Sequence, residues 1–273
     1  RDRNLTAPLA QLVYVQAEVV WGIVRDLHTA SDRIDSDASM RWRGPALKPG
    51  QSALEHYLRE GQFQGLSPNR YFDGAWYLNH NPDVADAGLG ALDHYLSLGW
   101  REGRDPSPLL WNDWYLASNP DVREAQINPL RHFVEHGQFE GRDPNPVCSA
   151  DHYWRQLARG KSDAPDPLGH YLHSGWQAGL DPSAWFDTDW YLARNPDVRE
   201  AGANPLMHFL YHGLDEGRDP GPAFNSSWYL NEYPDVAENA VCAFRHYLEY
   251  GRQEGRAPRA PAPQIEPARC PIA

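Results

Sequence analysis

The sequence has almost no lysine and a strong excess of acidic residues. Lys48 and Lys161 are the only lysines among 25 basic residues, so nearly all of the positive charge is arginine, which suits fixed, bidentate pairing with carboxylates. With 37 acidic residues the net charge is −12. A chain this acidic repels a phosphate backbone, so we expect no nucleic-acid partner.

Cysteines and long apolar runs are also scarce. Cys148, Cys242 and Cys270 are odd in number, far apart and in no CxxC spacing, which predicts neither a disulfide framework nor a zinc site. The most apolar stretch, residues 5–17, is uncharged for only 13 residues, against the roughly 20 that a membrane-spanning helix needs. We therefore expect no transmembrane segment.

What the sequence does contain is a repeat of 38 residues. Histidine recurs at this step in six positions: His56, His94, His132, His170, His208 and His246. Glycine does so in two columns: Gly61, Gly99, Gly137, Gly175, Gly213 and Gly251, then Gly65, Gly103, Gly141, Gly179, Gly217 and Gly255. We number the copies 1 to 6 as residues 35–72, 73–110, 111–148, 149–186, 187–224 and 225–262.

The fifth copy predicts two or three short helices. Asp187 is placed to cap a first helix, and the Asn-Pro pairs at 195–196 and 204–205 each predict a further start, with Asn as cap and Pro at the first helical position. Gly213 is expected to end the last helix. No stretch alternates with a period of two, so we expect no sheet.

These units predict an all-α, solenoid-like stack of six 38-residue helical repeats over residues 35–258. A single unit cannot bury its apolar face alone, so it stacks on its neighbours, and contacts are expected between adjacent copies. Residues 1–34 are expected to form an N-terminal capping helix, with a partner-binding or membrane-surface helix as the alternative. Residues 259–273 are a Pro-rich tail, and an ordered tail would favour a larger assembly.

Two columns of opposite charge are gained and lost together. The copies with an NPDV aspartate also carry an EGR arginine, whereas copies 1 and 4 have neither. This predicts an ion pair within each copy, the alternative being two unrelated surface charges lost in divergent copies. The predicted pairs are Asp83 with Arg104, Asp121 with Arg142, Asp197 with Arg218, and Asp235 with Arg256.

The histidine column favours structure over metal binding. Neighbouring helices in a stack lie roughly 8 to 10 Å apart, too far for two column histidines to share a zinc ion. We expect each imidazole to be half-buried and to bond a backbone carbonyl at a helix end. No catalytic, metal or cofactor site is predicted: the triplets at 35–37 and 187–189 are weak DxD matches, and Cys148 and Cys242 fit packing.

Trp100 and Trp176 occupy a column in which other copies have glutamine, leucine or arginine. The fold therefore does not demand tryptophan there, and these two rings are candidates for contact with a partner or a sugar ring. The alternative is extra packing between copies 2, 3 and 4.

The string WYL..NPDV......NPL.HYL..G..EGRDP.P, at Trp114 to Pro146 and Trp190 to Pro222, resembles repeats that accompany bacterial glycosyltransferases for cell-surface polysaccharides, and some large secreted repeat proteins. The resemblance implies an accessory module without catalytic residues. We expect a non-enzymatic scaffold that binds a protein partner in a bacterial cell-surface or membrane-peripheral assembly, the alternative being a glycan-binding, glycosyltransferase-associated module. A third alternative is that the chain is itself catalytic, which only Asp35 and Asp37 support.

Overall fold

The computed structural model describes residues 53–157, 166–239 and 242–261. The expected capping helix in residues 1–34, the Asp35 and Asp37 triplet, the start of copy 1, Cys270 and the tail from residue 262 lie outside the described residues.

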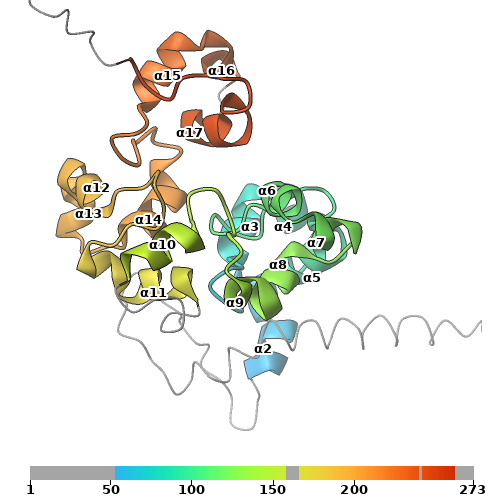
Figure 1. Ribbon diagram of the computed structural model, residues 1–273. Coiled ribbons are helices and arrows are strands. Elements are labelled where there is room, and N and C mark those ends of the chain that lie inside the picture. The colour runs from blue at the N-terminus through green and yellow to red at the C-terminus, as the bar shows by residue number, and fades with distance from the viewer. Residues whose placement is uncertain (1–52, 158–165, 240–241, 262–273) are drawn as a thin grey trace, which may run out of the picture.

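The described part of the chain is all-α, as predicted, and its named elements are all helical (Figure 1). Copies 1 to 3 contain α2 (Ala53–Arg59), η1 (Gly61–Phe63), α3 (Gly74–His80), α4 (Pro82–Asp86), α5 (Ala91–His94), η2 (Tyr95–Gly99), α6 (Asn112–Ser118), α7 (Pro120–Glu124), α8 (Pro129–His132), η3 (Phe133–Gly137) and α9 (Gln138–Glu140). Copies 4 to 6 contain α10 (Ala150–Gln156), α11 (Pro167–His173), η5 (Gly175–Ala178), α12 (Thr188–Arg194), α13 (Pro196–Glu200), α14 (Pro205–His208), η6 (Phe209–Gly213), α15 (Ser226–Glu232), α16 (Pro234–Glu238), α17 (Ala243–His246) and η7 (Tyr247–Gly251).

Helix starts follow the predicted caps with one exception. The Asp187 carboxylate accepts the backbone N–H of Trp190 at the start of α12, and the Asn204 amide oxygen accepts that of Met207 at the start of α14. Asn195 makes no side-chain cap to α13. Its amide instead donates to the Tyr191 carbonyl and accepts from Arg218, so this asparagine links helices rather than capping one.

The last helical element of copy 5 ends at Gly213, as predicted, but Gly213 is not the left-handed cap residue. Gly213 is the last residue of the π-helical turn η6, and the left-handed position follows four residues later at Gly217, with φ +66°. The N–H of Arg218 then donates to the Gly213 carbonyl at 2.8 Å, the six-to-one bond of a Schellman cap. The same bond recurs in every described copy, so the second glycine column provides the left-handed residue of the cap.

Apolar columns form one continuous core through the described copies. The tyrosine of the WYL motif and the aromatic residue after each column histidine are buried in copies 2 to 6, and their rings meet edge to face in pairs such as Tyr77 with Tyr95 at 5.9 Å. Cys148 fills the column of Phe186 and is buried, in line with the predicted packing role.

Adjacent copies are joined through an aspartate column, which directly follows the column of the EGR arginine. Asp181 accepts the backbone N–H of Thr188, the first residue of the next copy's α12, at 2.8 Å. Asp105, Asp143 and Asp219 do the same for the helices that follow them. This column therefore fixes each new copy to the end of the preceding one.

The expectation that contacts stop at the neighbouring copy is wrong. The Tyr211 hydroxyl of copy 5 donates to Asp73 of copy 2 at 3.0 Å. Arg245 of copy 6 donates to Asp105 of copy 2 at 2.8 Å, and its guanidinium lies 4.5 Å from the centre of the Trp111 ring. The copies therefore turn back on themselves, and copies more than one step apart are bonded to each other.

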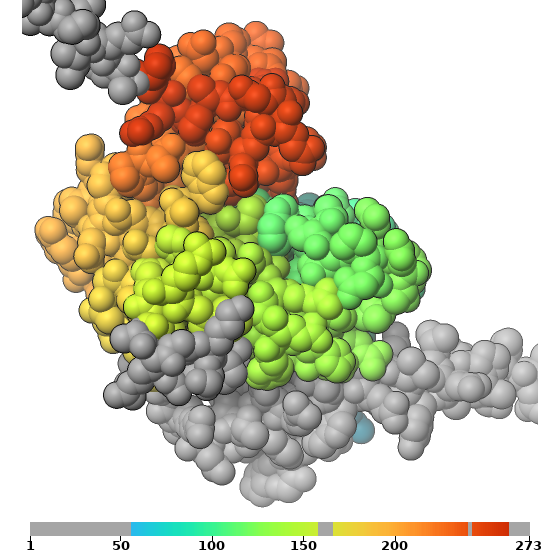
Figure 2. Space-filling view, in the orientation of Figure 1, coloured from blue at the N-terminus to red at the C-terminus, as the bar shows by residue number. Residues whose placement is uncertain are grey.

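This arrangement is visible in the ribbon and the surface. Copies 2 and 3 (α3–α9) lie to one side, copies 4 and 5 (α10–α14) to the other, and copy 6 (α15–α17) crosses above them (Figure 1). Figure 2 shows the surface of copy 6 meeting both sides. None of the described helices has the length and apolar character needed to span a membrane.

Deleting copy 3 (residues 111–148) tests this arrangement. The deletion removes Trp111 and shortens the chain between Asp105 and Arg245, so we expect a protein that melts well below the parent in circular dichroism and aggregates in gel filtration. If contacts between neighbours were sufficient, the shortened chain would remain a monomer and melt at the temperature of the parent.

Candidate functional site

The histidine column is engaged inside each copy. A hydrogen bond of 2.6 to 3.0 Å joins the histidine Nδ1 to the hydroxyl of the tyrosine 17 residues earlier, in the pairs Tyr77–His94, Tyr115–His132, Tyr153–His170, Tyr191–His208 and Tyr229–His246. The predicted partner, a backbone carbonyl, is therefore wrong for Nδ1. In copy 1 the His56 Nδ1 lies 3.7 Å from a carboxylate oxygen of Glu60.

The first glycine column makes room for this bond. A Cβ built on Gly99 would lie 2.1 Å from the Tyr77 hydroxyl oxygen, and Gly137 has the same relation to Tyr115 at 2.4 Å. Only a residue without a side chain lets the tyrosine reach the histidine. Tyrosine, histidine and glycine thus form one packing unit that repeats with the sequence.

Acid is expected to weaken the fold through two of these histidines. Burial, with a smaller contribution from a nearby arginine, holds the pKa of His132 and of His208 below the ordinary value of 6.5. The unfolded chain therefore binds more protons near pH 6.5 than the native chain, and the free energy of unfolding falls as the pH is lowered through this value. His132→Gln combined with His208→Gln should flatten that fall between pH 7.5 and 6, measured by urea denaturation.

The window ends at pH 6 because Asp143 acts in the opposite direction. Burial raises the pKa of Asp143 to about 6, so the native chain binds this proton before the unfolded chain does and gains stability as the pH falls further. An equal slope in the parent and the double variant above pH 6 would contradict the role given to the histidines.

The predicted ion pairs within copies are present. In copy 3 the Arg142 guanidinium donates to both carboxylate oxygens of Asp121, at 2.8 and 2.9 Å, to Asn119 and to Glu140. Copies 2 and 5 repeat this cluster. In copy 6, Arg256 pairs with Asp235 and Glu254 and lies over the Tyr233 ring, which takes the place of the asparagine.

These clusters fix helices rather than offering charge to a ligand. Each arginine uses most of its five donors in these bonds. In copy 3, the bond from Arg142 lowers the pKa of the Asp121 carboxyl to about 2. The aspartates are exposed, so the pairs are surface pairs that set the crossing of the second helix on the EGR turn more than they add stability.

The weaker chemical candidates do not assemble into a site. Among the described residues no three His, Cys, Asp or Glu side chains come together as metal ligands. Asp187 of the second DxD triplet is the helix cap of α12. Burial raises the pKa of the Cys148 and Cys242 thiols, the opposite of what a nucleophile needs.

The two candidate tryptophans differ in accessibility. Trp100 is only 5% exposed, its indole N–H donates to the Leu96 carbonyl, and Arg101 lies over its ring, so it offers no surface to a partner or a sugar. Trp176 is half-buried against the core. Its indole N–H is buried without a hydrogen-bond partner. Packing explains Trp100, whereas Trp176 is partly exposed.

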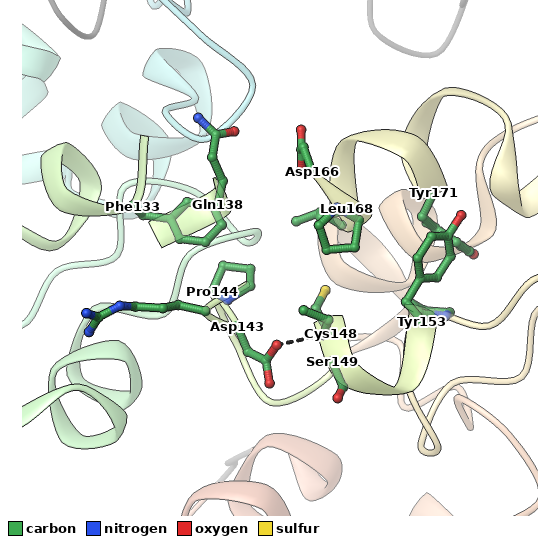
Figure 3. A pocket seen from close by; sticks show the side chains of 14 residues that line it. Phe133, Gln138, Asp143, Pro144, Cys148, Ser149, Tyr153, Asp166, Leu168 and Tyr171 are labelled. Atoms are coloured by element: carbon green, nitrogen blue, oxygen red, sulfur yellow. Dashed lines mark hydrogen bonds between the residues drawn. The ribbon is translucent and has the colours of Figure 1, made fainter. Parts of the chain in front are cut away.

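A small pocket lies between copies 3 and 4, with room for about one water molecule (Figure 3). Phe133, Gln138 and Asp143 line it from copy 3, and Tyr153 and Tyr171 face them from copy 4. The Asp143 carboxylate accepts one backbone N–H, from Ala150 at 2.7 Å. No arginine, lysine or histidine of the described chain pairs with it.

Nothing in the repeat pattern distinguishes Asp143 or Arg245. Asp143 belongs to a column whose members all bond the next helix, and it differs only in facing a pocket. The tyrosine column could have been found, because tyrosine stands 17 residues before the histidine in copies 2 to 6. No protein-family model, no curated protein and no solved structure matches the chain.

Proposed function

We propose that the chain is a non-catalytic module of six helical repeats that binds a protein partner in a bacterial cell-surface or polysaccharide-related assembly. One observation carries this proposal. The recurring residues that usually perform chemistry, namely histidine, arginine and aspartate, are bonded within and between the copies. They serve to hold the repeats, which leaves the surface of the array as the part that acts.

The WYL, NPDV and EGR motifs resemble repeats that accompany polysaccharide glycosyltransferases. This resemblance supports the proposal that the assembly is at the bacterial cell surface or related to polysaccharides. It also supports a second candidate, a glycan-binding accessory module. The observation in favour of that candidate is the half-buried Trp176, since a partly exposed indole can contact a sugar ring.

One experiment compares the two candidates. The intact chain is tagged and expressed in a bacterium whose genome encodes it, and complexes are purified under native conditions, with the cell's polysaccharide tested separately for binding. The proposal expects a protein partner in fixed stoichiometry that stays bound through gel filtration and is retained by Trp176→Ala.

Leu214→Ala is the matched control, because Leu214 is half-buried in the same column of copy 5 and is not aromatic. Polysaccharide binding that is lost in Trp176→Ala and retained in Leu214→Ala would establish the glycan module instead. Turnover of a sugar nucleotide by the purified chain would overturn both candidates.

A further inference from the structure

Two copies carry a second histidine four residues after the column histidine. The pairs are His132 with His136 in copy 3 and His208 with His212 in copy 5. In both copies the column histidine is the last residue of α8 or α14, and its companion lies one turn later in η3 or η6. The ring centres of the two imidazoles are 5.8 Å apart in copy 3 and 5.6 Å apart in copy 5. Because α8 and α14 belong to different groups of copies, the two pairs are separate (Figure 1).

The fold of the copy sets the spacing of these rings. In copy 6 the residue at the companion position is Tyr250, and its ring centre lies 5.7 Å from that of His246. In copy 1 the same position holds Glu60, whose carboxylate lies 3.7 Å from the Nδ1 of His56. The side chain four residues after the column histidine thus faces that imidazole in copies 1, 3, 5 and 6. A histidine at this position brings a second ring nitrogen close to the first.

One nitrogen of each column histidine remains available. The tyrosine hydroxyl occupies Nδ1 of His132 and of His208, whereas Nε2 of both rings makes no hydrogen bond in the described part of the chain. Neither Nε2 is among the buried atoms that lack a partner, so this nitrogen reaches solvent. His136 and His212 are exposed. A metal-binding histidine is usually oriented by a hydrogen bond at its other nitrogen, and the tyrosine hydroxyl can accept the Nδ1 proton and so leave the lone pair on Nε2.

We infer that each pair binds one divalent transition-metal ion of the Zn²⁺, Ni²⁺ and Cu²⁺ class through its two imidazoles. Two imidazoles on one tetrahedral ion have ring centres about 5 Å apart, so a small rotation of the exposed ring brings both nitrogens into range. Imidazole suits these ions, whereas Mg²⁺ and Ca²⁺ prefer oxygen ligands. Two ligands leave the other positions to water, because the Glu140 carboxylate one turn further on is already bonded to Arg142.

The charge beside each pair favours a cation. In copy 3 the nearest cation to His132 is Arg142, and it is paired with both Asp121 and Glu140. This cluster of one positive and two negative groups has a net charge of about −1, which attracts a metal ion. Copy 5 repeats the same cluster beside its own histidine pair.

The test titrates Zn²⁺ into the full chain, first freed of metal with a chelator, and follows binding by isothermal titration calorimetry at pH 7.5. We expect two sites per chain, and a melting temperature that rises with Zn²⁺ because the ion binds the native chain. Mg²⁺ should produce neither effect. His136→Ala and His212→Ala should each remove one site, and the double variant should bind at least tenfold more weakly. Both residues are exposed, so these variants are expected to fold. His80→Ala is the control, because His80 is exposed but faces Trp76 rather than a second histidine, and it should keep both sites.

Tyr250→His tests the same geometry by gain of a site. Tyr250 is 56% exposed and already holds its ring beside His246, so the new histidine should raise the number of Zn²⁺ sites from two to three. An unchanged number in this variant would overturn the inference. So would the absence of saturable Zn²⁺ binding by the parent, both sites remaining in the variant that lacks His136 and His212, or an equal loss in His80→Ala.

Discussion

Replacing Arg245 with methionine is expected to lower the free energy of unfolding by about 2 to 4 kcal/mol, the cost of leaving one member of a buried, hydrogen-bonded charge pair alone. Asp105 is 9% exposed in its side chain, and burial raises its pKa even with the arginine present. Arg245 is 37% exposed, which keeps the expected loss below that of a fully buried pair. Urea denaturation followed by circular dichroism measures it.

Arg131→Met is the matched control for this variant. Arg131 occupies the column of Arg245 in copy 3 and makes the same ion pair with a glutamate four residues later, but it has no distant carboxylate. Its loss should cost no more than about 0.5 kcal/mol. Adding Asp105→Asn to Arg245→Met should restore part of the stability, because the uncompensated charge is removed. Equal losses in Arg245→Met and Arg131→Met would contradict the long-range contact.

Replacing Gly99 with alanine is expected to destabilise the fold by about 1 to 5 kcal/mol, after an offset of about 1 kcal/mol because alanine is the better helix former. The new Cβ would lie 2.1 Å from the Tyr77 hydroxyl, so the ring must move, which costs about 1 to 3 kcal/mol for overpacking and about 1 to 3 kcal/mol for the lost bond to His94. Thermal and urea unfolding measure the change.

A double-mutant cycle separates this contact from a general effect of alanine. Tyr77→Phe removes the oxygen that collides, and the nearest remaining ring atom, Cζ, lies 3.4 Å from the built Cβ. The double variant should therefore be more stable than the sum of the single losses by at least about 1 kcal/mol. Gly88→Ala is the control: nothing lies within 4 Å of its Cβ, and only its φ of +65° opposes alanine. Simple additivity of Gly99→Ala and Tyr77→Phe would refute the packing unit.

The all-α class and the Asp–Arg pairs could be predicted from the sequence because the residues that determine them recur at the same positions in several copies. Asp121 and Arg142 recur at fixed positions and disappear together in copies 1 and 4, so comparison of copies was enough to pair them. Asp187 and Asn204 were identifiable as caps because capping is a local property of the chain.

The bonding partner of each histidine could not be read in this way. A half-buried imidazole accepts several partners, and the choice of the Tyr115 hydroxyl for His132 depends on how the first and last helices of a copy cross. The left-handed cap at Gly217 rather than Gly213 has a similar cause, since the role of Gly213 is to leave space for Tyr191, which is a tertiary contact.

The contacts between distant copies had no signal in the repeat. Arg245 has no counterpart in copies 1, 2, 4 and 5, where its column holds other residues, so nothing in the pattern marks its bond to Asp105. A repeat fixes the unit and its junction to the next unit. Each copy is rotated relative to the one before it, and the sum of these rotations decides which distant copies meet. This sum cannot be predicted from the residues of one column.

Hydrogen exchange measured by mass spectrometry tests whether copy 6 returns onto copies 2 and 3. In Arg245→Met, amide protection should fall in α17 and η7 (243–251) and also in α6 (112–118), which begins at the Asp105 bond. Arg131→Met should leave α6 as protected as in the parent. Protection lost in copy 6 alone, with α6 unchanged in Arg245→Met, would show that copy 6 does not stabilise copies 2 and 3 through this bond.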